Sequence, residues 1–231
     1  SVHIPIQAIK GRGISHHQPH RFERDAREAF DDGWGALDGA ARARDEAPPP
    51  ATEVSWEDCR SAITHNDSPD IGFQLGLNPY RGCEHGCIYC YARPSHAFWG
   101  FSPGLDFETR LFAKLNAAEL LRREFAKPGY QPDTIVLGAN TDPYQPIEEH
   151  YRITRAVLEV CLETRHPVTI TTKSARVLRD LDLLGELARL NLTAVGISVT
   201  SLDPKLSGIL EPRASSPAKR LDALGKLAAA G

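Results

Sequence analysis

The chain has 231 residues, a length that suits one α/β domain with an extension or two small domains. Hydrophobic residues make up 41% of it and charged residues 25%, which is typical of a soluble globular protein. The formal net charge of −3 excludes a global basic field that would attract nucleic acid or membrane. No window is apolar for long enough to span a bilayer, so we expect no membrane partner.

The cysteine content indicates the compartment. The chain contains five cysteines, and three of them fall within eight residues. This usage fits a reducing cytosol better than a secreted disulfide scaffold. The first residues lack a charged region followed by an apolar run, so they do not read as a signal peptide. We therefore expect a cytoplasmic protein.

Residues 1–52 differ in composition from the rest of the chain. They contain Gly11-Arg-Gly13 and end in the proline run Pro48–Pro50. A proline run is extended and separates folded units. We predict an irregular N-terminal arm and linker over 1–52, able to wrap the main domain, and a core domain over 53–231.

A three-cysteine segment follows the first predicted strand. Residues 72–77 alternate in hydrophobicity and predict that strand. Cys83, Cys87 and Cys90 come next, with the spacing Cys-x3-Cys-x2-Cys. Three thiolates can hold an iron–sulfur cluster that keeps one iron open to another molecule, whereas a closed structural metal site takes four protein ligands. The spacing therefore favours a site that performs chemistry.

Three other sites fit this segment less well. A zinc site could take His85 or Cys59 as its fourth ligand, but zinc sites usually pair two short Cys-x2–4-Cys units. An electron-transfer cluster needs a fourth cysteine, and Cys59 is the only serious candidate because Cys161 lies on an apolar helix stripe. A disulfide is disfavoured by the spacing and by a reducing compartment.

Predicted helices and strands alternate after the cysteines. Helices are expected at 117–126, from 153, from 177, and from 217 to 230, where Ser216 and Pro217 form the N-cap and the first helical position. Strands are expected at 134–137, at the β-branched run 168–171, and at 193–200. This alternation predicts a parallel sheet with right-handed crossovers. The fold class is therefore α/β, with about four βα units.

Polar side chains follow the strands of this predicted sheet. Ligands of parallel α/β folds bind at these carboxyl ends. A cation there suits a carboxylate ligand, and oxygen acceptors suit an ammonium group. Polar residues at strand ends are also common turn formers, but their succession after a three-cysteine loop favours a binding site. The residues are Asn140, Thr141, Asp142, Lys173, Ser198 and, further along, Arg213.

The cysteine spacing resembles the cluster loop of the radical S-adenosylmethionine (SAM) superfamily. Other segments between residues 60 and 231 are similar to one bacterial subgroup, labelled spore-photoproduct-lyase-like. These segments are Asn78-Pro-Tyr-Arg-Gly-Cys83, Ser102-Pro-Gly-Leu-Asp-Phe-Glu108, Asn140-Thr-Asp-Pro-Tyr-Gln-Pro-Ile-Glu148, Thr172-Lys-Ser174 and Glu211-Pro-Arg213.

The resemblance implies a fold, two cofactors and a partner. The fold is a partial, TIM-like (βα)6 barrel, and because the chain stops where a fifth strand is expected, we predict a fragment of a longer protein. The cofactors are a [4Fe–4S] cluster on Cys83, Cys87 and Cys90 and SAM chelated at the open iron. An electron from the cluster splits SAM into methionine and a 5′-deoxyadenosyl radical, and a donor of flavodoxin or ferredoxin type supplies it.

The resemblance also assigns residues to SAM. Tyr91 matches a tyrosine near SAM, Lys173 matches a lysine that contacts the SAM carboxylate, and Ser198 matches a serine near the end of strand four. The other residues expected to surround SAM are Tyr89, Asn140, Thr141, Asp142 and Arg213.

One departure from the subgroup changes the expected reaction. The lyase has a catalytic cysteine before the turn that follows strand two, and this chain has Ala139 there. No thiol at that position can return a hydrogen atom, so cleavage of a thymine dimer by that mechanism is not inherited. Tyr144 is an alternative hydrogen donor, although a core or turn role fits it better.

We therefore predict a lyase-like radical SAM enzyme without an assigned substrate. Nucleic acid is the leading candidate, by family analogy alone, and small molecules or peptides stay open. The alternative function is a metal-stabilised binding module, with zinc or an inert iron–sulfur cluster held by the three cysteines and Cys59.

Overall fold

A five-stranded sheet forms the centre of the protein, in a computed structural model that describes residues 9, 11–15, 18 and 51–231. β2 pairs with β3 in antiparallel fashion, and the remaining pairings are parallel. The strands, in spatial order, are β2 (Thr64–His65), β3 (Leu75–Leu77), β6 (Ile135–Leu137), β7 (Val168–Thr172) and β8 (Thr193–Ile197).

The predicted strands form the parallel part of this sheet. Three are shorter than predicted, since β3 begins at Leu75, β6 begins at Ile135 and β8 ends at Ile197. Leu77 lies opposite Leu137 across β3 and β6, and Leu137 lies opposite Ile170 across β6 and β7. These side chains are buried, and a slip of one residue would turn them to the opposite face. Burial of this face therefore sets the register.

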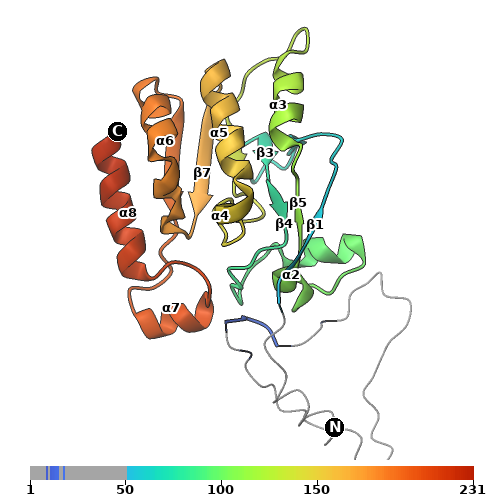
Figure 1. Ribbon diagram of the computed structural model, residues 1–231, viewed down its shortest axis with the longest axis vertical. Coiled ribbons are helices and arrows are strands. Elements are labelled where there is room, and N and C mark those ends of the chain that lie inside the picture. The colour runs from blue at the N-terminus through green and yellow to red at the C-terminus, as the bar shows by residue number, and fades with distance from the viewer. Residues whose placement is uncertain (1–8, 10, 16–17, 19–50) are drawn as a thin grey trace, which may run out of the picture.

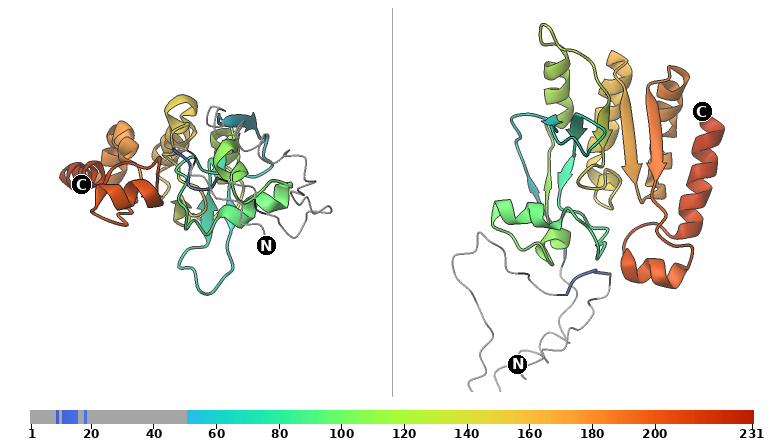
Figure 2. Two further views of the ribbon diagram at one scale, coloured as in Figure 1. Left: turned by 90° about the horizontal axis from the view of Figure 1, so that it is seen from below. Right: turned by 180° about the vertical axis from the view of Figure 1, so that it is seen from behind.

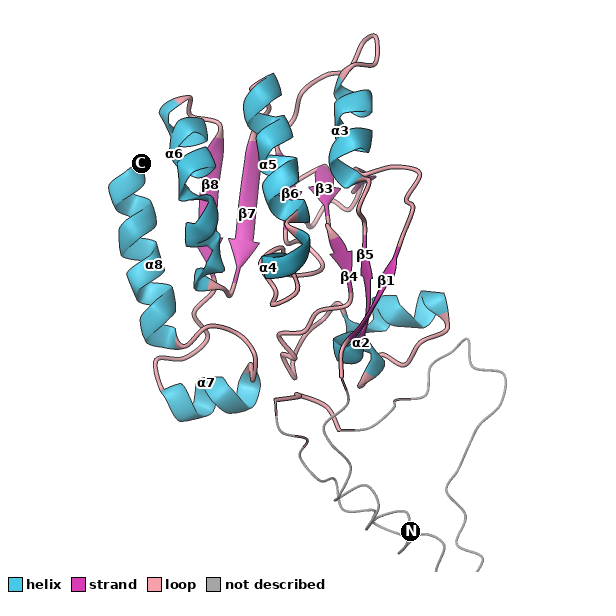
Figure 3. Cartoon of the chain, in the orientation of Figure 1, coloured by secondary structure: helices cyan, strands magenta, loops and turns pink. Residues whose placement is uncertain are grey.

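Helices cover one face of the sheet (Figures 1 and 3). The stripe predicted from residue 177 is divided, because η2 (Ala175–Asp180) is a short 3-10 helix that precedes α6. Ser216 precedes the last helix with extended backbone, as predicted, but its side chain makes no capping hydrogen bond. The predicted helices are α3 (Ala117–Phe125), α5 (Ile153–Thr164), α6 (Leu181–Arg189) and α8 (Pro217–Ala230).

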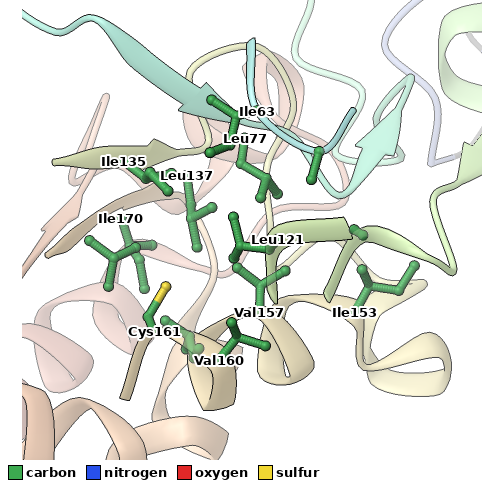
Figure 4. Packing of buried hydrophobic residues seen from close by; sticks show 14 of the residues in the cluster. Ile63, Leu77, Leu121, Ile135, Leu137, Ile153, Val157, Val160, Cys161 and Ile170 are labelled. Atoms are coloured by element: carbon green, nitrogen blue, oxygen red, sulfur yellow. The ribbon is translucent and has the colours of Figure 1, made fainter. Parts of the chain in front are cut away.

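The main core lies between the sheet and these helices (Figure 4). Leu121 of α3 and Val157 of α5 lie in it together with Ile135 and Leu137 of β6. Cys161 is fully buried in the same core, as its place on the apolar stripe predicts. Each large apolar side chain buried in this way stabilises the fold by about 1.5–3 kcal/mol. Cys161 is therefore a packing residue.

A second sheet, with the order β1-β5-β4, is absent from the predicted elements. β5 pairs with β1 in parallel and with β4 in antiparallel fashion. These strands have only two to four residues, too few for a readable alternation pattern. β4 ends just before Cys83 and so carries the cysteine segment. The strands are β1 (Glu53–Trp56), β4 (Tyr80–Arg81) and β5 (Arg110–Ala113).

The cysteine segment lies at the carboxyl ends of the parallel strands. In Figure 1 the arrow of β7 points down towards α7, and the segment between β4 and η1 lies at that same end. Figure 2 shows β7 and β8 from the other side, with the helices behind them. No helix among the described residues is long and apolar enough to cross a membrane. The shorter elements are η1 (Arg93–Trp99), α2 (Asp106–Thr109), α4 (Glu148–Tyr151) and α7 (Pro204–Leu210).

Most of the predicted N-terminal arm falls outside the described residues, and so does the proline run 48–50. The described residues 12–14 make hydrogen bonds to α2 of the core domain. The domain division after residue 52 stays a prediction.

Candidate functional site

Three unpaired cysteines share one loop between β4 and η1. Cys83 and Cys87 are buried, Cys90 is half-buried, and none of them is in a disulfide. Cys83 and Cys90 belong to a small apolar cluster with Ala92 and Phe107, separate from the main core. The loop therefore carries three sheltered thiols that are available as ligands.

Hydrogen bonds from two sides fix the backbone of this loop. The Cys83 N–H donates to the carbonyl of Phe107 at 2.8 Å. The guanidinium of Arg93, itself 5% exposed, donates to the carbonyl of Cys87 through Nε at 3.1 Å and Nη2 at 2.9 Å. A ligand site works best when its own supports are rigid. Cys83 and Cys87 are thus positioned before any cofactor binds.

Glu84 joins the loop to three distant parts of the chain. Its carboxylate lies 3.0 Å from Arg213 Nη1 and accepts a hydrogen bond from Thr52 Oγ1 at 2.6 Å. Its N–H donates to Oε1 of the buried Gln145 at 2.9 Å. The Arg213 N–H also donates to the carbonyl of His85 at 3.2 Å. Arg213 therefore fastens the cysteine loop, and its predicted contact with SAM stays a prediction.

His85 lies between the cysteine loop and the turn after β6. Its side chain is 1% exposed, and Nδ1 is 3.2 Å from Asp142 Oδ2, a contact that lacks hydrogen-bond geometry. Neither ring nitrogen has a hydrogen-bond partner among the described residues. Buried polar atoms normally have partners. An imidazole that faces the Asp142 carboxylate but lacks hydrogen bonds, in a loop with three unpaired thiols, fits a site that accepts a further group.

Asp142 joins the ends of β6 and β7. Its carboxylate accepts hydrogen bonds from Thr172 Oγ1 at 2.7 Å, from the Lys173 N–H at 2.7 Å and from the Tyr144 N–H at 2.9 Å. Burial raises the pKa of Asp142, but His85 and these donors outweigh it and lower the pKa to about 2. The carboxylate oxygens of Asp142 thus stabilise the turn by accepting these hydrogen bonds. Direct contact of Asp142 with SAM stays a prediction.

Asn140 and Thr141 share this turn but differ in what their side chains do. Both backbone N–H groups donate to Asn78 Oδ1, at 3.0 Å and 3.2 Å. Thr141 is buried, and its hydroxyl donates to the carbonyl of Tyr80 at 3.0 Å. The Asn140 side chain makes no hydrogen bond to the described part of the chain. Asn140 is thus the residue of this turn best able to accept an ammonium group.

Lys173 and Tyr89 come together at the end of β7. Lys173 Nζ lies 5.9 Å from the centroid of the Tyr89 ring, within the range of a cation–π contact. The Tyr89 hydroxyl is 2.9 Å from Thr200 Oγ1 and also donates to the Glu211 carboxylate. Lys173 forms no ion pair with any described residue. It is therefore a cation that an incoming carboxylate can meet.

The charge of Lys173 also acts on the thiol of Cys87. Burial raises the pKa of Cys87 to about 12, and Lys173 is the main charge that opposes this rise. Burial also raises the pKa of Cys83 well above its ordinary value. A coordinating metal deprotonates a thiol outright. These cysteines thus have the character of sheltered metal ligands more than of exposed nucleophiles.

Tyr91 and Ser198 complete the predicted set. The Tyr91 hydroxyl donates to the carbonyl of Ala139, so this side chain connects the cysteine loop to the turn after β6. Ser198 is half-buried beyond the end of β8, and its N–H donates to the carbonyl of Thr172 at 2.9 Å. The structure therefore gathers the predicted residues at one end of the sheet, and their contacts with SAM stay predictions.

The arrangement of the three thiols is compatible with a multi-iron cluster. Within the described residues, no three His, Cys, Asp or Glu side chains converge on one metal position. A cubane cluster does not need such convergence, because each cysteine binds a different iron. Cys59 lies elsewhere, with its thiol 3.1 Å from Asn116 Oδ1. The binding-module alternative, which needs Cys59 as fourth ligand, thus lacks that ligand here.

Several residues that support the site were missed by sequence reasoning. Glu108, Gln145 and Glu211 stand in segments that resemble the subgroup, so a signal existed, but it assigned them no role. Arg93 and Arg220 gave no signal, because a buried arginine is recognised only when its partner in the fold is known. Arg93 pairs with Glu108, and Arg220 pairs with Glu211.

Residues 77–231 match the radical SAM superfamily, and the chain belongs to that superfamily. It is 35% identical over 205 residues to an uncharacterized protein of Mycobacterium tuberculosis, covering 85% of this chain and 60% of the relative. It is 30% identical over 156 residues to an uncharacterized protein of Methanocaldococcus jannaschii, covering 68% of this chain and 56% of that relative. The chain thus spans somewhat more than half the length of these relatives.

Solved structures of spore photoproduct lyase share the fold. One variant, with bound AdoMet and dinucleoside spore photoproduct, has a TM-score of 0.56 and 20% sequence identity, covering 77% of this chain and 48% of that chain. A second variant has a TM-score of 0.56 and 19% identity over the same shares. The predicted α/β fold of the radical SAM type is confirmed. At this identity the likeness concerns the fold alone.

Proposed function

We propose that this chain is a radical SAM enzyme in which Cys83, Cys87 and Cys90 bind a [4Fe–4S] cluster and SAM binds at the open iron. The observation that carries the proposal is one rigid loop with three unpaired cysteines at the carboxyl ends of parallel strands. Lys173 lies at the end of β7 beside the Tyr89 ring of the cysteine loop and has no ion-pair partner among the described residues, as a site for the SAM carboxylate requires.

The cofactors would supply the hard chemistry, and the chain would bind and orient them. When bound, they would supply one-electron reductive cleavage of SAM to methionine and a 5′-deoxyadenosyl radical for hydrogen abstraction, with a reduced flavodoxin or ferredoxin as the electron donor. We assign Lys173 to the SAM carboxylate and Asn140 to its ammonium group. Tyr89, Tyr91 and Ser198 are assigned to the wall around SAM.

The test is anaerobic reconstitution with iron and sulfide, reduction with dithionite, and an assay for 5′-deoxyadenosine with SAM present. The proposal predicts a brown protein that forms 5′-deoxyadenosine, and a Cys87→Ala variant that does neither. A colourless protein that holds zinc instead would contradict it. If the protein is brown but forms no product, the longer relative from Mycobacterium tuberculosis is assayed in parallel, and failure there would also contradict it.

The reaction would differ from that of a lyase with a cysteine after strand two. Ala139 occupies that position, and its carbonyl accepts a hydrogen bond from Tyr91. Tyr144 is fully buried, and its hydroxyl donates to Asp180 Oδ2 at 3.0 Å, which is the core role that fits it better. Neither residue offers a hydrogen atom to a substrate radical. We therefore propose a reaction in which this turn returns no hydrogen atom.

A basic cavity supports nucleic acid as the substrate class. The cavity has a volume of about 400 Å³ and is lined by Arg176, Arg213 and Lys219, with Ser215 and Ser216, and by no acidic residue of the described part of the chain. Arg176 and Arg213 each have one carboxylate partner outside the lining, and Lys219 has none among the described residues. The Ser215 N–H donates to the carbonyl of Lys173, so the cavity adjoins the proposed SAM site. Phosphates are bound by such groups.

Binding of a short single-stranded oligonucleotide, followed by fluorescence anisotropy, tests this substrate class. We expect Lys219→Glu to weaken binding about three- to tenfold and to reduce its salt dependence, because one phosphate contact is lost. Lys226→Glu is the matched control, since Lys226 lies on the same helix and outside the cavity lining. Competition with inorganic phosphate shows whether the phosphate group alone is recognised. Equal affinities of the two variants would exclude this cavity as the binding site.

The binding-module alternative is tested with two serine variants. It predicts that Cys59→Ser loses metal as completely as Cys87→Ser. The enzyme proposal predicts that the Cys59→Ser variant keeps its iron and sulfide. In the wild type the Cys59 thiol is hydrogen-bonded to Asn116 and lies away from the cysteine loop. Metal analysis of both variants after reconstitution distinguishes the two functions.

A further inference from the structure

The described part of the N-terminal arm contacts a fully buried carboxylate next to the cysteine loop. Glu108, on α2, is 0% exposed. It accepts hydrogen bonds from the Gly13 N–H at 2.9 Å, from the Ile14 N–H at 3.1 Å and from Arg93 Nη2 at 2.6 Å. A buried charge is tolerated only when it is paired and hydrogen-bonded. Among the described residues, two of the three donors to this carboxylate thus come from the arm, more than 90 positions earlier in the chain.

The arm also touches the backbone of the cysteine loop directly. A Cβ atom added at Gly13 would lie 1.8 Å from the carbonyl oxygen of Gly86, which stands between Cys83 and Cys87. A Cβ atom at Gly86, which has φ of +68°, would lie 2.8 Å from Glu108 Oε2 and 3.2 Å from the Gly13 nitrogen. Both positions therefore require glycine, because two backbones and one carboxylate meet there.

Arg12 extends this contact to the other side of the loop. Its Nη1 donates to the carbonyl of Glu108 at 2.8 Å, and its Nη2 donates to Thr52 Oγ1 at 3.0 Å. The Thr52 hydroxyl donates in turn to Glu84, the residue that follows Cys83. The segment Gly11–Ile14, blue in Figure 1, thus reaches the loop through Gly86 and through Glu84.

The same carboxylate links the arm to Cys87. Arg93 donates both to Glu108 and to the carbonyl of Cys87, and its Nη1 donates to the carbonyl of Gly104 at 3.0 Å. If the arm leaves, Glu108 loses two donors and its surroundings open to water. Arg93, which donates to the Cys87 carbonyl, would then be paired with a more mobile Glu108 carboxylate. The backbone of Cys87 would be held less firmly as a result.

We propose that Gly11–Ile14 is a positioning element of the cofactor site, which docks on Glu108 and Gly86 and fixes the backbone between Cys83 and Cys87. The inference rests on the proposed function, since it gives this segment a role in holding the cluster. The Gly11-Arg-Gly13 motif would therefore position the cysteine loop, a role that the residue types alone do not indicate. The residues act through the loop and touch neither cluster nor SAM.

The first test needs no cofactor. Amide hydrogen exchange is measured on the full apo chain for the wild type, Gly13→Ala and the control Gly11→Ala. A Cβ at Gly11 meets no atom within 4 Å, and Gly11 has φ of +75°, so this variant controls for backbone strain in the arm without the clash on Gly86. In the loop, the N–H groups of Glu84 and Ile88 are hydrogen-bonded and should be protected. We expect them to exchange about tenfold faster or more in Gly13→Ala only, the factor expected when hydrogen bonds to a charged group are lost.

The second test follows the reconstituted protein. We expect Gly13→Ala to release iron to a chelator about tenfold faster than Gly11→Ala and wild type, with a changed electron paramagnetic resonance spectrum of the reduced cluster when SAM is added. Arg12→Met removes the hydrogen bonds to Glu108 and Thr52 without a clash and should shift both readouts in the same direction by a smaller factor. It keeps the proposal testable if Gly13→Ala fails to fold.

The outcomes separate this inference from the proposed function. Equal exchange and equal iron release in Gly13→Ala and Gly11→Ala would overturn the inference even if the wild type forms 5′-deoxyadenosine. A wild type that binds no cluster would contradict the proposed function, and the role of the segment in the cofactor site would fall with it. In that case a faster exchange in Gly13→Ala would show the docking contact alone.

Discussion

The carboxylate of Asp142 accepts a hydrogen bond from the backbone N–H of Lys173 at 2.7 Å, so the turn after β6 is joined directly to the end of β7. The same carboxylate holds the Thr172 hydroxyl and faces His85 of the cysteine loop. Three of the segments that form the site therefore meet at one side chain. A change at Asp142 should disturb all three at once.

We predict that Asp142→Asn lowers the free energy of unfolding of the apo chain by about 1–3 kcal/mol, the loss typical of a buried polar group left with wrong partners. The amide NH2 of asparagine would face donors, because Thr172, Lys173 and Tyr144 all donate to this position. Urea unfolding measures the effect. Asp182→Asn is the control, since Asp182 is 59% exposed in its pair with Arg155 and should lose less than about 1 kcal/mol. Similar losses for both variants would contradict the prediction.

We predict that Arg220→Met is among the most destabilising changes near the site. Arg220 is fully buried, pairs with the buried Glu211 and donates to the carbonyls of Ser215 at 2.7 Å and Ser198 at 2.9 Å. Its removal leaves an unpaired buried carboxylate, so the free energy of unfolding should fall by about 3–5 kcal/mol.

A second substitution shows whether the unpaired charge is the cause. Glu211→Gln in the Arg220→Met background removes that charge and should recover part of the lost stability. Lys226→Met on the same helix breaks an exposed pair with Asp222 and should change stability by less than about 1 kcal/mol. Urea unfolding of the four proteins decides the point. If the double variant is less stable than Arg220→Met, the unpaired charge does not explain the loss.

The sequence predicted the parallel sheet because its strands and helices carry their burial pattern locally. The β-branched run at 168–171 and the apolar stripe of α5 both depend on neighbours within a few residues, and both elements are present. The strands β1, β4 and β5 were missed because each is short and is stabilised by partners far along the chain. Local patterns cannot show such pairings.

The candidate site divides in the same way. Spacing alone identified Cys83, Cys87 and Cys90, because the loop that carries them is local. Spacing could not show that the Asp142 carboxylate accepts hydrogen bonds from Thr172 and Lys173, because a position at a strand end does not reveal where the side chain points. Nor could it find the Gly13 contact with Glu108, which joins residues 95 positions apart.

We predict that Gly138→Ala destabilises the fold and displaces the turn that carries Asn140. Gly138 has φ of +91°, and an added Cβ would lie 2.2 Å from the Thr171 carbonyl oxygen and 2.9 Å from Pro143 Cδ. Gly129 is a close control, because its φ is +80° and a Cβ there meets nothing within 4 Å. Positive φ costs each alanine about 1–2 kcal/mol, and the clash with the backbone of β7 should add at least about 1 kcal/mol to Gly138→Ala alone. Urea unfolding measures both variants, and equal losses would show that the turn absorbs the added methyl group.

We predict that His166 makes the fold less stable in mild acid. Burial lowers the pKa of His166, although the carbonyl of Pro167 opposes this shift. The ring stacks on Phe125 at 4.1 Å, and Nε2 is 2.8 Å from the Tyr130 hydroxyl. In the unfolded chain a histidine takes up its proton near pH 6.5. Below that pH the unfolded state binds more protons than the folded state, so stability falls with pH until the folded pKa is reached.

His166→Gln should remove this contribution. Urea unfolding at about pH 7.5 and about pH 5.5 should show a smaller loss of stability in the variant than in the wild type, because only the wild type gains the proton on unfolding. His65→Gln, on the exposed strand β2, is the control and should lose as much as the wild type. The sign of the difference is the decisive point, because glutamine can change the absolute stability at both pH values equally. An unchanged difference between the two pH values would mean that His166 is protonated as readily in the fold as in the unfolded chain.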